Sequence, residues 1–213
     1  MAPGKSGSRG RRWGLTLTLV ATVAVVLVLV VVLIMPRFHH SPSSAGGVLG
    51  DERLYTLVSG APQSLRVTVD GVANGSRIPV EYTCDGADRP PRVTVSGIPA
   101  GNGTLILIVY DPDAPGGTFI HWLAYHRVSS RTGGVSSVFP SPSDVYGVNS
   151  FGRVGYGGPC PPPGSTHHYY FLVLYVPGSL QLPTGYSFQE LYSAVKGAGV
   201  DSWGYAVLLY SRG

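Results

Sequence analysis

The hydrophobic pattern of this chain changes abruptly near residue 37. From Trp13 to Pro36 the sequence holds no charged residue in 24 positions, and Val and Leu dominate it. An α-helix of that length would extend about 36 Å, whereas the hydrocarbon core of a bilayer is about 30 Å thick. The pattern therefore predicts one transmembrane helix over residues 13–36.

Beyond residue 60 the pattern becomes that of short strands separated by turns. We predict strands over 65–69, 92–95, 104–110, 120–126, 168–176 and 204–210. One helical stretch interrupts them, because Ser187 is a typical N-cap with Glu190 three residues later, and it should end near Gly197. The fold class is therefore mainly β and antiparallel, with few short helices, preceded by one N-terminal transmembrane helix.

The distribution of Lys and Arg around the apolar stretch predicts which side of the membrane each segment occupies. Residues 1–12 contain four Lys or Arg and no acidic residue, and only Arg37 follows the apolar stretch closely. The positive-inside rule then makes 1–12 a cytoplasmic basic tail and 13–36 a single-pass anchor in the cell membrane. Residues 37–60, rich in Gly, Ser and Pro at their start, are expected to be a linker, and 61–213 an extracytoplasmic domain.

A cleaved signal peptide is the competing interpretation of the N-terminus. Its apolar region is normally about 7–15 residues long and ends at a site of small residues. The run here is longer, and Met35-Pro-Arg-Phe-His-His40 follows it. We therefore favour a retained anchor.

The net charge of +4 belongs to the N-terminal segment. Residues 38–213 hold ten basic and eleven acidic residues, a net charge of −1. A domain that binds nucleic acid would carry a basic patch, so no nucleic-acid partner is expected.

Two polar motifs lie next to predicted strands. The first, Tyr110-Asp-Pro-Asp-Ala-Pro115 with His121 after it, places carboxylates and a histidine on a turn stiffened by proline. The second is the loop 152–164, rich in Gly and Pro, which leads to His167. Such a loop presents backbone N–H groups to an anion. The simpler readings are that the aspartates cap their own turn and that the loop is a rigid surface feature.

These motifs, with Gly155-Tyr-Gly-Gly-Pro-Cys-Pro-Pro-Pro-Gly164 and Tyr82-Thr-Cys-Asp-Gly86, resemble the phosphatidylethanolamine-binding protein family, in its bacterial and archaeal Raf-kinase-inhibitor-like branch. The resemblance covers roughly residues 62–212. It implies an antiparallel β-sandwich-like fold with a small pocket for phosphate or a phospholipid headgroup. His168 should face away from that pocket, because side chains alternate along a strand. The implied ligand-binding residues are Asp111, Asp113, Pro115, His121, Gly158, Pro161, His167 and Tyr169.

The chemistry of these residues fits an anion without a cofactor. Protonated histidines, backbone N–H groups and a tyrosine hydroxyl are donors, and Asp111 would accept a hydrogen bond from a histidine and raise its pKa. The set Asp111, His121 and His167 also matches a two-histidine, one-carboxylate metal site, but we expect no metal because the Gly/Pro loop would then have no role. Cys84 and Cys160 form a disulfide or remain two thiols, and an extracytoplasmic location favours the disulfide.

The sequence thus predicts a membrane-anchored extracytoplasmic binding protein whose partner is a phosphate-containing small molecule or a phospholipid headgroup. The alternative is an inhibitor of serine proteases or other enzymes that acts through a surface loop such as Val135–Val148. An enzyme is not expected, since no Gly-x-Ser-x-Gly motif is present and no serine is clearly placed beside His121 or His167.

Overall fold

The computed structural model describes Met1 and residues 49–213. Apart from Met1, the predicted basic tail and anchor, and the linker up to residue 48, lie outside the described residues. Among the residues that are described, no helix is both long enough and apolar enough to cross a bilayer.

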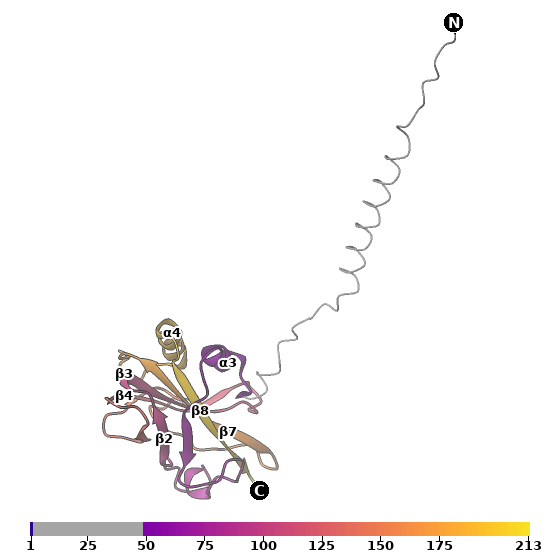
Figure 1. Ribbon diagram of the computed structural model, residues 1–213. Coiled ribbons are helices and arrows are strands. Elements are labelled where there is room, and N and C mark those ends of the chain that lie inside the picture. The colour runs from indigo at the N-terminus through magenta and orange to yellow at the C-terminus, as the bar shows by residue number, and fades with distance from the viewer. Residues whose placement is uncertain (2–48) are drawn as a thin grey trace. The chain divides into compact units, whose positions relative to one another are not determined.

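Two antiparallel sheets build the folded region (Figure 1). The larger has the strand order β6-β4-β3-β7-β8 and the smaller the order β1-β2-β5. The strands are β1 Arg66–Val69, β2 Val93–Ile98, β3 Gly101–Asp111, β4 Phe119–Ser130, β5 Val135–Phe139, β6 Val145–Tyr146, β7 Thr166–Pro177 and β8 Ser202–Ser211, and a short 3-10 helix spans Val80–Tyr82. The prediction of a mainly β, antiparallel fold is confirmed.

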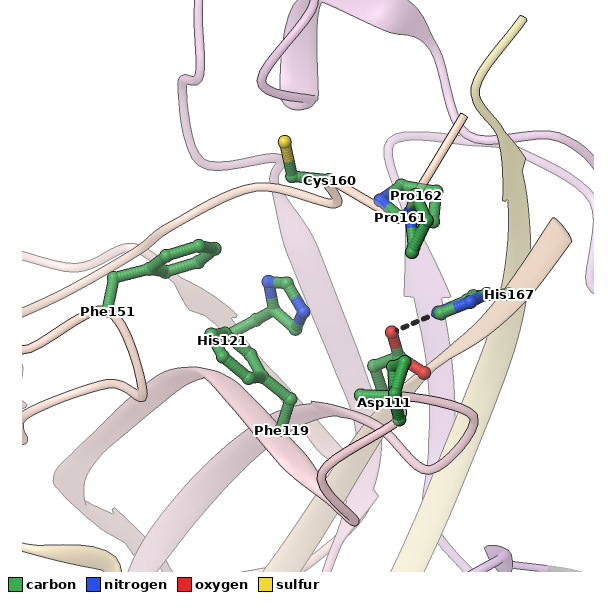
Figure 2. A pocket seen from close by; sticks show the side chains of 10 residues that line it. Asp111, Phe119, His121, Phe151, Cys160, Pro161, Pro162 and His167 are labelled. Carbon is green, nitrogen blue, oxygen red and sulfur yellow. Dashed lines mark hydrogen bonds and ion pairs between the residues drawn. The ribbon is translucent and has the colours of Figure 1, made fainter. Parts of the chain in front are cut away.

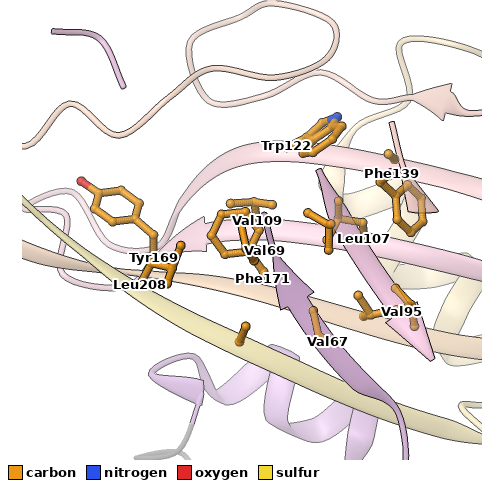
Figure 3. Packing of buried hydrophobic residues seen from close by; sticks show 14 of the residues in the cluster. Val67, Val69, Val95, Leu107, Val109, Trp122, Phe139, Tyr169, Phe171 and Leu208 are labelled. Carbon is orange, nitrogen blue, oxygen red and sulfur yellow. The ribbon is translucent and has the colours of Figure 1, made fainter. Parts of the chain in front are cut away.

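Strand β3 is buried on both faces, which explains its unbroken apolar sequence. Leu105, Leu107 and Val109 belong to the core between the two sheets, where Figure 3 shows Leu107 and Val109 with Val67 of β1. Ile106 and Ile108 alternate with them and face the opposite core. Because successive side chains of a strand point to opposite faces, one strand contributes to two cores.

Helices α3 (Glu52–Val58) and α4 (Phe188–Ala198) supply apolar residues to that second core. Helix α4 begins as predicted: the Ser187 side chain accepts from the backbone N–H of Glu190, and the Glu190 side chain accepts from that of Ser187. The cap is worth about 1 kcal/mol.

Helix α3 corrects the linker predicted over residues 37–60. Asp51 caps it, accepting hydrogen bonds from the backbone N–H groups of Arg53 (2.8 Å) and Leu54 (3.1 Å). Leu54 and Leu57 are buried in the second core. A helix of seven residues is marginal by itself, so its stability comes from this packing, which the sequence pattern does not reveal.

The segment 135–148, treated above as a surface loop, contains strands β5 and β6. It is tied to β4 by a hydrogen bond of 2.7 Å between Asp144 and His126. The segment is therefore largely part of the two sheets.

Candidate functional site

A pocket of about 220 Å³ lies where β3, β4 and β7 meet the Gly/Pro loop (Figure 2). Three of its lining residues are polar and ionisable, and most of the others are apolar. The lining residues are Asp111, Ala114, Pro115, Phe119, His121, Phe151, Cys160, Pro161, Pro162 and His167. The two sequence motifs, although far apart along the chain, thus form one site.

Asp111 ends strand β3 and uses both carboxylate oxygens. Its Oδ1 accepts from the backbone N–H of Asp113 (2.8 Å), and its Oδ2 is 2.7 Å from Nδ1 of His167 on β7. Asp111 therefore caps its own turn and orients a histidine, so both interpretations of this residue hold together. Its burial, with 3% of the residue exposed, shields the pair from water.

His121 on β4 is almost fully buried and is fixed by the Gly/Pro loop. Its Nδ1 lies 2.6 Å from the carbonyl oxygen of Gly157, and because a carbonyl only accepts, Nδ1 carries the proton. Burial lowers the pKa of His121, and the opposing effects of Gly157 and Asp111 do not reverse this. Asp111 does favour the charged form of His121, but desolvation is the larger effect and the net direction is downward.

Aromatic rings surround His121. The ring centroids of Phe119, Phe151 and Tyr169 lie 5.1, 5.5 and 5.2 Å from the centroid of the His121 ring. Tyr169 does not line the pocket but is fully buried behind the histidine. Burial, followed by the charge of Asp111, raises the pKa of Tyr169 beyond its ordinary range.

A disulfide joins Cys84 to Cys160, with 5.4 Å between the Cα atoms, as the sequence favoured. Cys160 forms part of the pocket wall. The backbone N–H of Cys84 also donates to the carbonyl oxygen of Pro159 (3.1 Å). The early loop therefore holds the Gly/Pro loop in place next to the site.

Besides Tyr169, the structure places two of the predicted residues, Asp113 and Gly158, away from the cavity. Asp113 turns outward and its carboxylate accepts from the backbone N–H (2.8 Å) of the exposed His168 and lies 2.7 Å from its Nδ1, so His168 faces away as expected. Gly158 donates its backbone N–H to Asp88 (2.6 Å). A Cβ atom at Gly158 would lie 2.3 Å from the carbonyl oxygen of Tyr82, so close packing requires glycine there.

The apolar walls were missed by reasoning from the sequence. Phe119 lies two positions before His121 on β4, and Phe151 directly precedes the glycine-rich loop. Their closeness to the motifs was the available signal, but aromatic residues in a β domain most often belong to its core. Ala114 and Pro162 were also not predicted.

In the part of the chain that the structure describes, no group of three or more His, Cys, Asp or Glu side chains is placed to hold a metal ion. The two-histidine, one-carboxylate alternative therefore gains no support. Asp111 instead binds one of the two histidines directly.

Several known proteins are similar to this chain in sequence or fold. The family model for phosphatidylethanolamine-binding protein matches residues 68–209. A UPF0098 protein of Aquifex aeolicus is 38% identical over 164 residues, which cover 74% of this chain and 95% of the relative. A Mycobacterium tuberculosis protein, LppC, whose name provisionally marks it as a lipoprotein, is 41% identical over 132 residues, 61% of this chain and 63% of LppC.

Among solved structures, Escherichia coli YbcL, described as a new member of the mammalian PEBP family, superposes with a TM-score of 0.59. It has 26% sequence identity, and the match covers 70% of this chain and 99% of YbcL. The family model runs from β1 into β8 and includes both motifs of the pocket. The chain therefore belongs to the phosphatidylethanolamine-binding protein family.

Proposed function

We propose that this protein binds a phosphate-type anion, free or as the headgroup of a phospholipid, in the pocket between His121 and His167. One observation carries the proposal: both rings are anchored through Nδ1, to Gly157 and to Asp111. The Nε2 atom of each ring is then the nitrogen left for a ligand. Two such atoms on separate strands suit a ligand with several oxygens.

The charge of His121 couples binding to pH. Because burial lowers its pKa below the usual value of about 6.5, the free ring is uncharged at neutral pH. An anion favours the protonated ring, so binding draws a proton onto His121. Affinity for an anion should consequently rise as the pH falls.

The rim of the pocket supports a ligand that comes from a lipid surface. Phe151, which lines the pocket, is 42% exposed. The guanidinium of Arg153 lies 5.3 Å from the centroid of the Phe151 ring and also 3.3 Å from the carboxylate of Asp88. An exposed aromatic side chain beside a cation matches the boundary between acyl chains and anionic headgroups.

The pocket is proposed to bind without catalysis. Its polar lining consists of Asp111, His121 and His167, and its only cysteine is in a disulfide. No serine, threonine or lysine stands among these lining residues to attack a phosphate ester. Asp111 and the two histidines could in principle attack a phosphate ester, but both oxygens of Asp111 and the Nδ1 atom of each histidine already take part in hydrogen bonds. We therefore propose that these groups orient and charge-balance a ligand.

Attachment to the cell membrane is part of the proposal and rests on the uncharged stretch 13–36. The name of LppC points the same way for a relative. A disulfide suits an oxidising compartment, which supports an extracytoplasmic domain. Membranes washed with alkaline carbonate should retain the full chain and release a variant that lacks residues 1–43.

The binding test compares two neighbouring histidines. Full-length protein in nonionic detergent is titrated calorimetrically with phosphoethanolamine at about pH 6, near the ordinary histidine pKa. His167→Gln should bind at least about tenfold more weakly, since it loses a hydrogen bond to a charged group. His168→Gln, altered on the outward face of the same strand, should bind like the wild type.

Equal affinities of the His167→Gln variant and the wild type would overturn the assignment of the site. A second arm distinguishes the sources of the phosphate. Residues 44–213, which form one compact unit, are sedimented with phosphatidylcholine vesicles with or without phosphatidylethanolamine. Binding of phosphoethanolamine without cosedimentation would identify a free phosphate ester as the ligand.

A further inference from the structure

A second group of polar side chains lies five residues further along β4 from His121, about 17 Å for an extended strand. His126 on β4 contacts Asp144 through Nδ1 (2.7 Å) and Ser137 on β5 through Nε2 (2.8 Å). Two short hydrogen bonds thus link a serine to a histidine and the histidine to an aspartate. None of them belongs to the pocket described above.

The hydrogen bonds determine the tautomer of His126. A carboxylate only accepts, so Nδ1 carries the ring proton and donates it to Asp144. In the neutral ring Nε2 then holds a lone pair, which accepts the hydroxyl proton of Ser137. This is the orientation in which a histidine acts as the general base for a serine nucleophile.

Asp144 is itself held rigidly. Its side chain is fully buried, and its Oδ2 accepts from the backbone N–H of Ser141 (2.7 Å) and from the hydroxyl of Tyr146 (3.2 Å). The ring of His126 packs 4.5 Å from that of Phe139, measured between centroids. Both the base and the residue that orients it are therefore fixed before any ligand arrives, as such a site requires.

The three residues differ in their exposure to solvent. His126 and Asp144 are buried, whereas Ser137 is half-exposed on β5, an edge strand of the smaller sheet. Of the three residues, Ser137 is therefore the one that solvent and a dissolved ester can reach.

We infer that Ser137, His126 and Asp144 form a second site, at which Ser137 is a nucleophile toward carboxylic esters. Ser137 Oγ attacks the carbonyl carbon while its proton moves to Nε2 of His126. The bond to the alcohol oxygen breaks, and Nε2 returns the proton to the departing alkoxide. Water then hydrolyses the acyl-serine through the same histidine, so one ester and one water yield one acid and one alcohol.

The test uses the full-length protein in nonionic detergent and a fluorophosphonate probe. Attack by Ser137 forms an oxygen–phosphorus bond and expels fluoride, and the adduct is located by peptide mass spectrometry. Wild-type protein should be labelled on Ser137, and Ser137→Ala should lose the adduct. Ser136→Ala, on the neighbouring exposed serine, should be labelled at the wild-type rate.

Asp144→Asn separates a nucleophilic role from a purely structural one, since the amide no longer orients the same tautomer of His126. Labelling should slow by at least about 100-fold, and hydrolysis of p-nitrophenyl acetate should fall in parallel. Circular dichroism and binding of phosphoethanolamine verify that each variant is folded. Absence of an adduct on wild-type Ser137, or equal rates for folded Asp144→Asn and wild type, would overturn the inference while leaving the anion pocket untouched.

Discussion

His121 and Gly157 hold one another through two hydrogen bonds. Nδ1 of His121 donates to the carbonyl oxygen of Gly157 (2.6 Å), and the backbone N–H of Gly157 donates to the carbonyl oxygen of His121 (2.9 Å). The pair joins β4 to a loop 36 residues further along the chain. This reciprocal contact determines where the Gly/Pro loop lies over the pocket.

Gly157→Ala is predicted to weaken ligand binding more than it affects stability. The added Cβ would lie 2.6 Å from Cδ2 of Phe151, whose exposed ring can move outward. Unfolding free energy should change by less than about 1 kcal/mol. Affinity for phosphoethanolamine should fall by about fivefold, because the displaced ring leaves the pocket wall.

Gly116→Ala is the matched control, since it lies on the β3–β4 turn and its new Cβ would meet no atom within 4 Å. Calorimetric titration of both variants gives the comparison. Unchanged affinity in Gly157→Ala would show that Phe151 takes no part in binding.

Without ligand, the unfolding free energy is predicted to decrease as the pH is lowered, because His121 is buried. Its folded-state pKa is lowered by burial, so below about pH 6.5 the unfolded chain binds a proton that the folded protein does not. The unfolding free energy should therefore decline from that pH until the folded-state pKa is reached. Above about pH 6.5 this residue contributes no pH dependence.

Urea unfolding of the wild type and of His121→Gln between about pH 5 and 8 measures this contribution. The variant cannot titrate at this position and should show a flatter profile. Sulfate, which keeps its charge over this range, should oppose the decline in the wild type by favouring the protonated ring. Identical profiles for the two proteins would contradict the prediction.

Gly158→Ala is predicted to destabilise the fold strongly, although Gly158 does not touch the cavity. Its Cβ would lie 2.3 Å from the carbonyl oxygen of Tyr82 and 2.9 Å from the Cα atom of Thr83, which are backbone atoms. Overpacking of this kind costs about 3 kcal/mol. Gly197→Ala in helix α4, where no atom lies within 4 Å, should instead stabilise by about 0.5 kcal/mol. Chemical denaturation of both variants distinguishes packing from ligand contact as the reason for a glycine at position 158.

Loss of the disulfide is predicted to cost about 4 kcal/mol of unfolding free energy, since the bridge closes a loop across a sequence separation of 76. Denaturation with and without a reducing agent measures the effect. The double variant Cys84→Ser/Cys160→Ser should match the reduced protein and ignore the reductant, because the chain has two cysteines in total. A wild type insensitive to complete reduction would contradict this prediction.

Much of the fold could be predicted from the local pattern of residue types along the sequence. Runs of β-branched residues marked the long strands, and Ser187 with Glu190 marked the start of α4. Helix α3 and strands β5 and β6 were not predicted. These elements are short, and their side chains are stabilised by contacts with distant strands rather than by their own periodicity.

The polar residue types of the site were also evident from the sequence, but the directions of their side chains were not. Asp111 and Asp113 are separated by two positions, which in a continuous strand would place them on one face. The turn that begins at Pro112 interrupts the alternation, so Asp111 contacts His167 inside and Asp113 contacts His168 outside.

The sequence by itself determined the β class, the family, and the presence of two histidines and a carboxylate in motifs that belong together. Only the tertiary structure decided which ring atom of His121 and of His167 is already occupied, and that burial lowers the pKa of His121. It also brought Ser137 and Asp144 to either side of His126. The physical reason is that hydrogen-bond partners and desolvation depend on which distant segments pack together, and local periodicity carries no record of that packing.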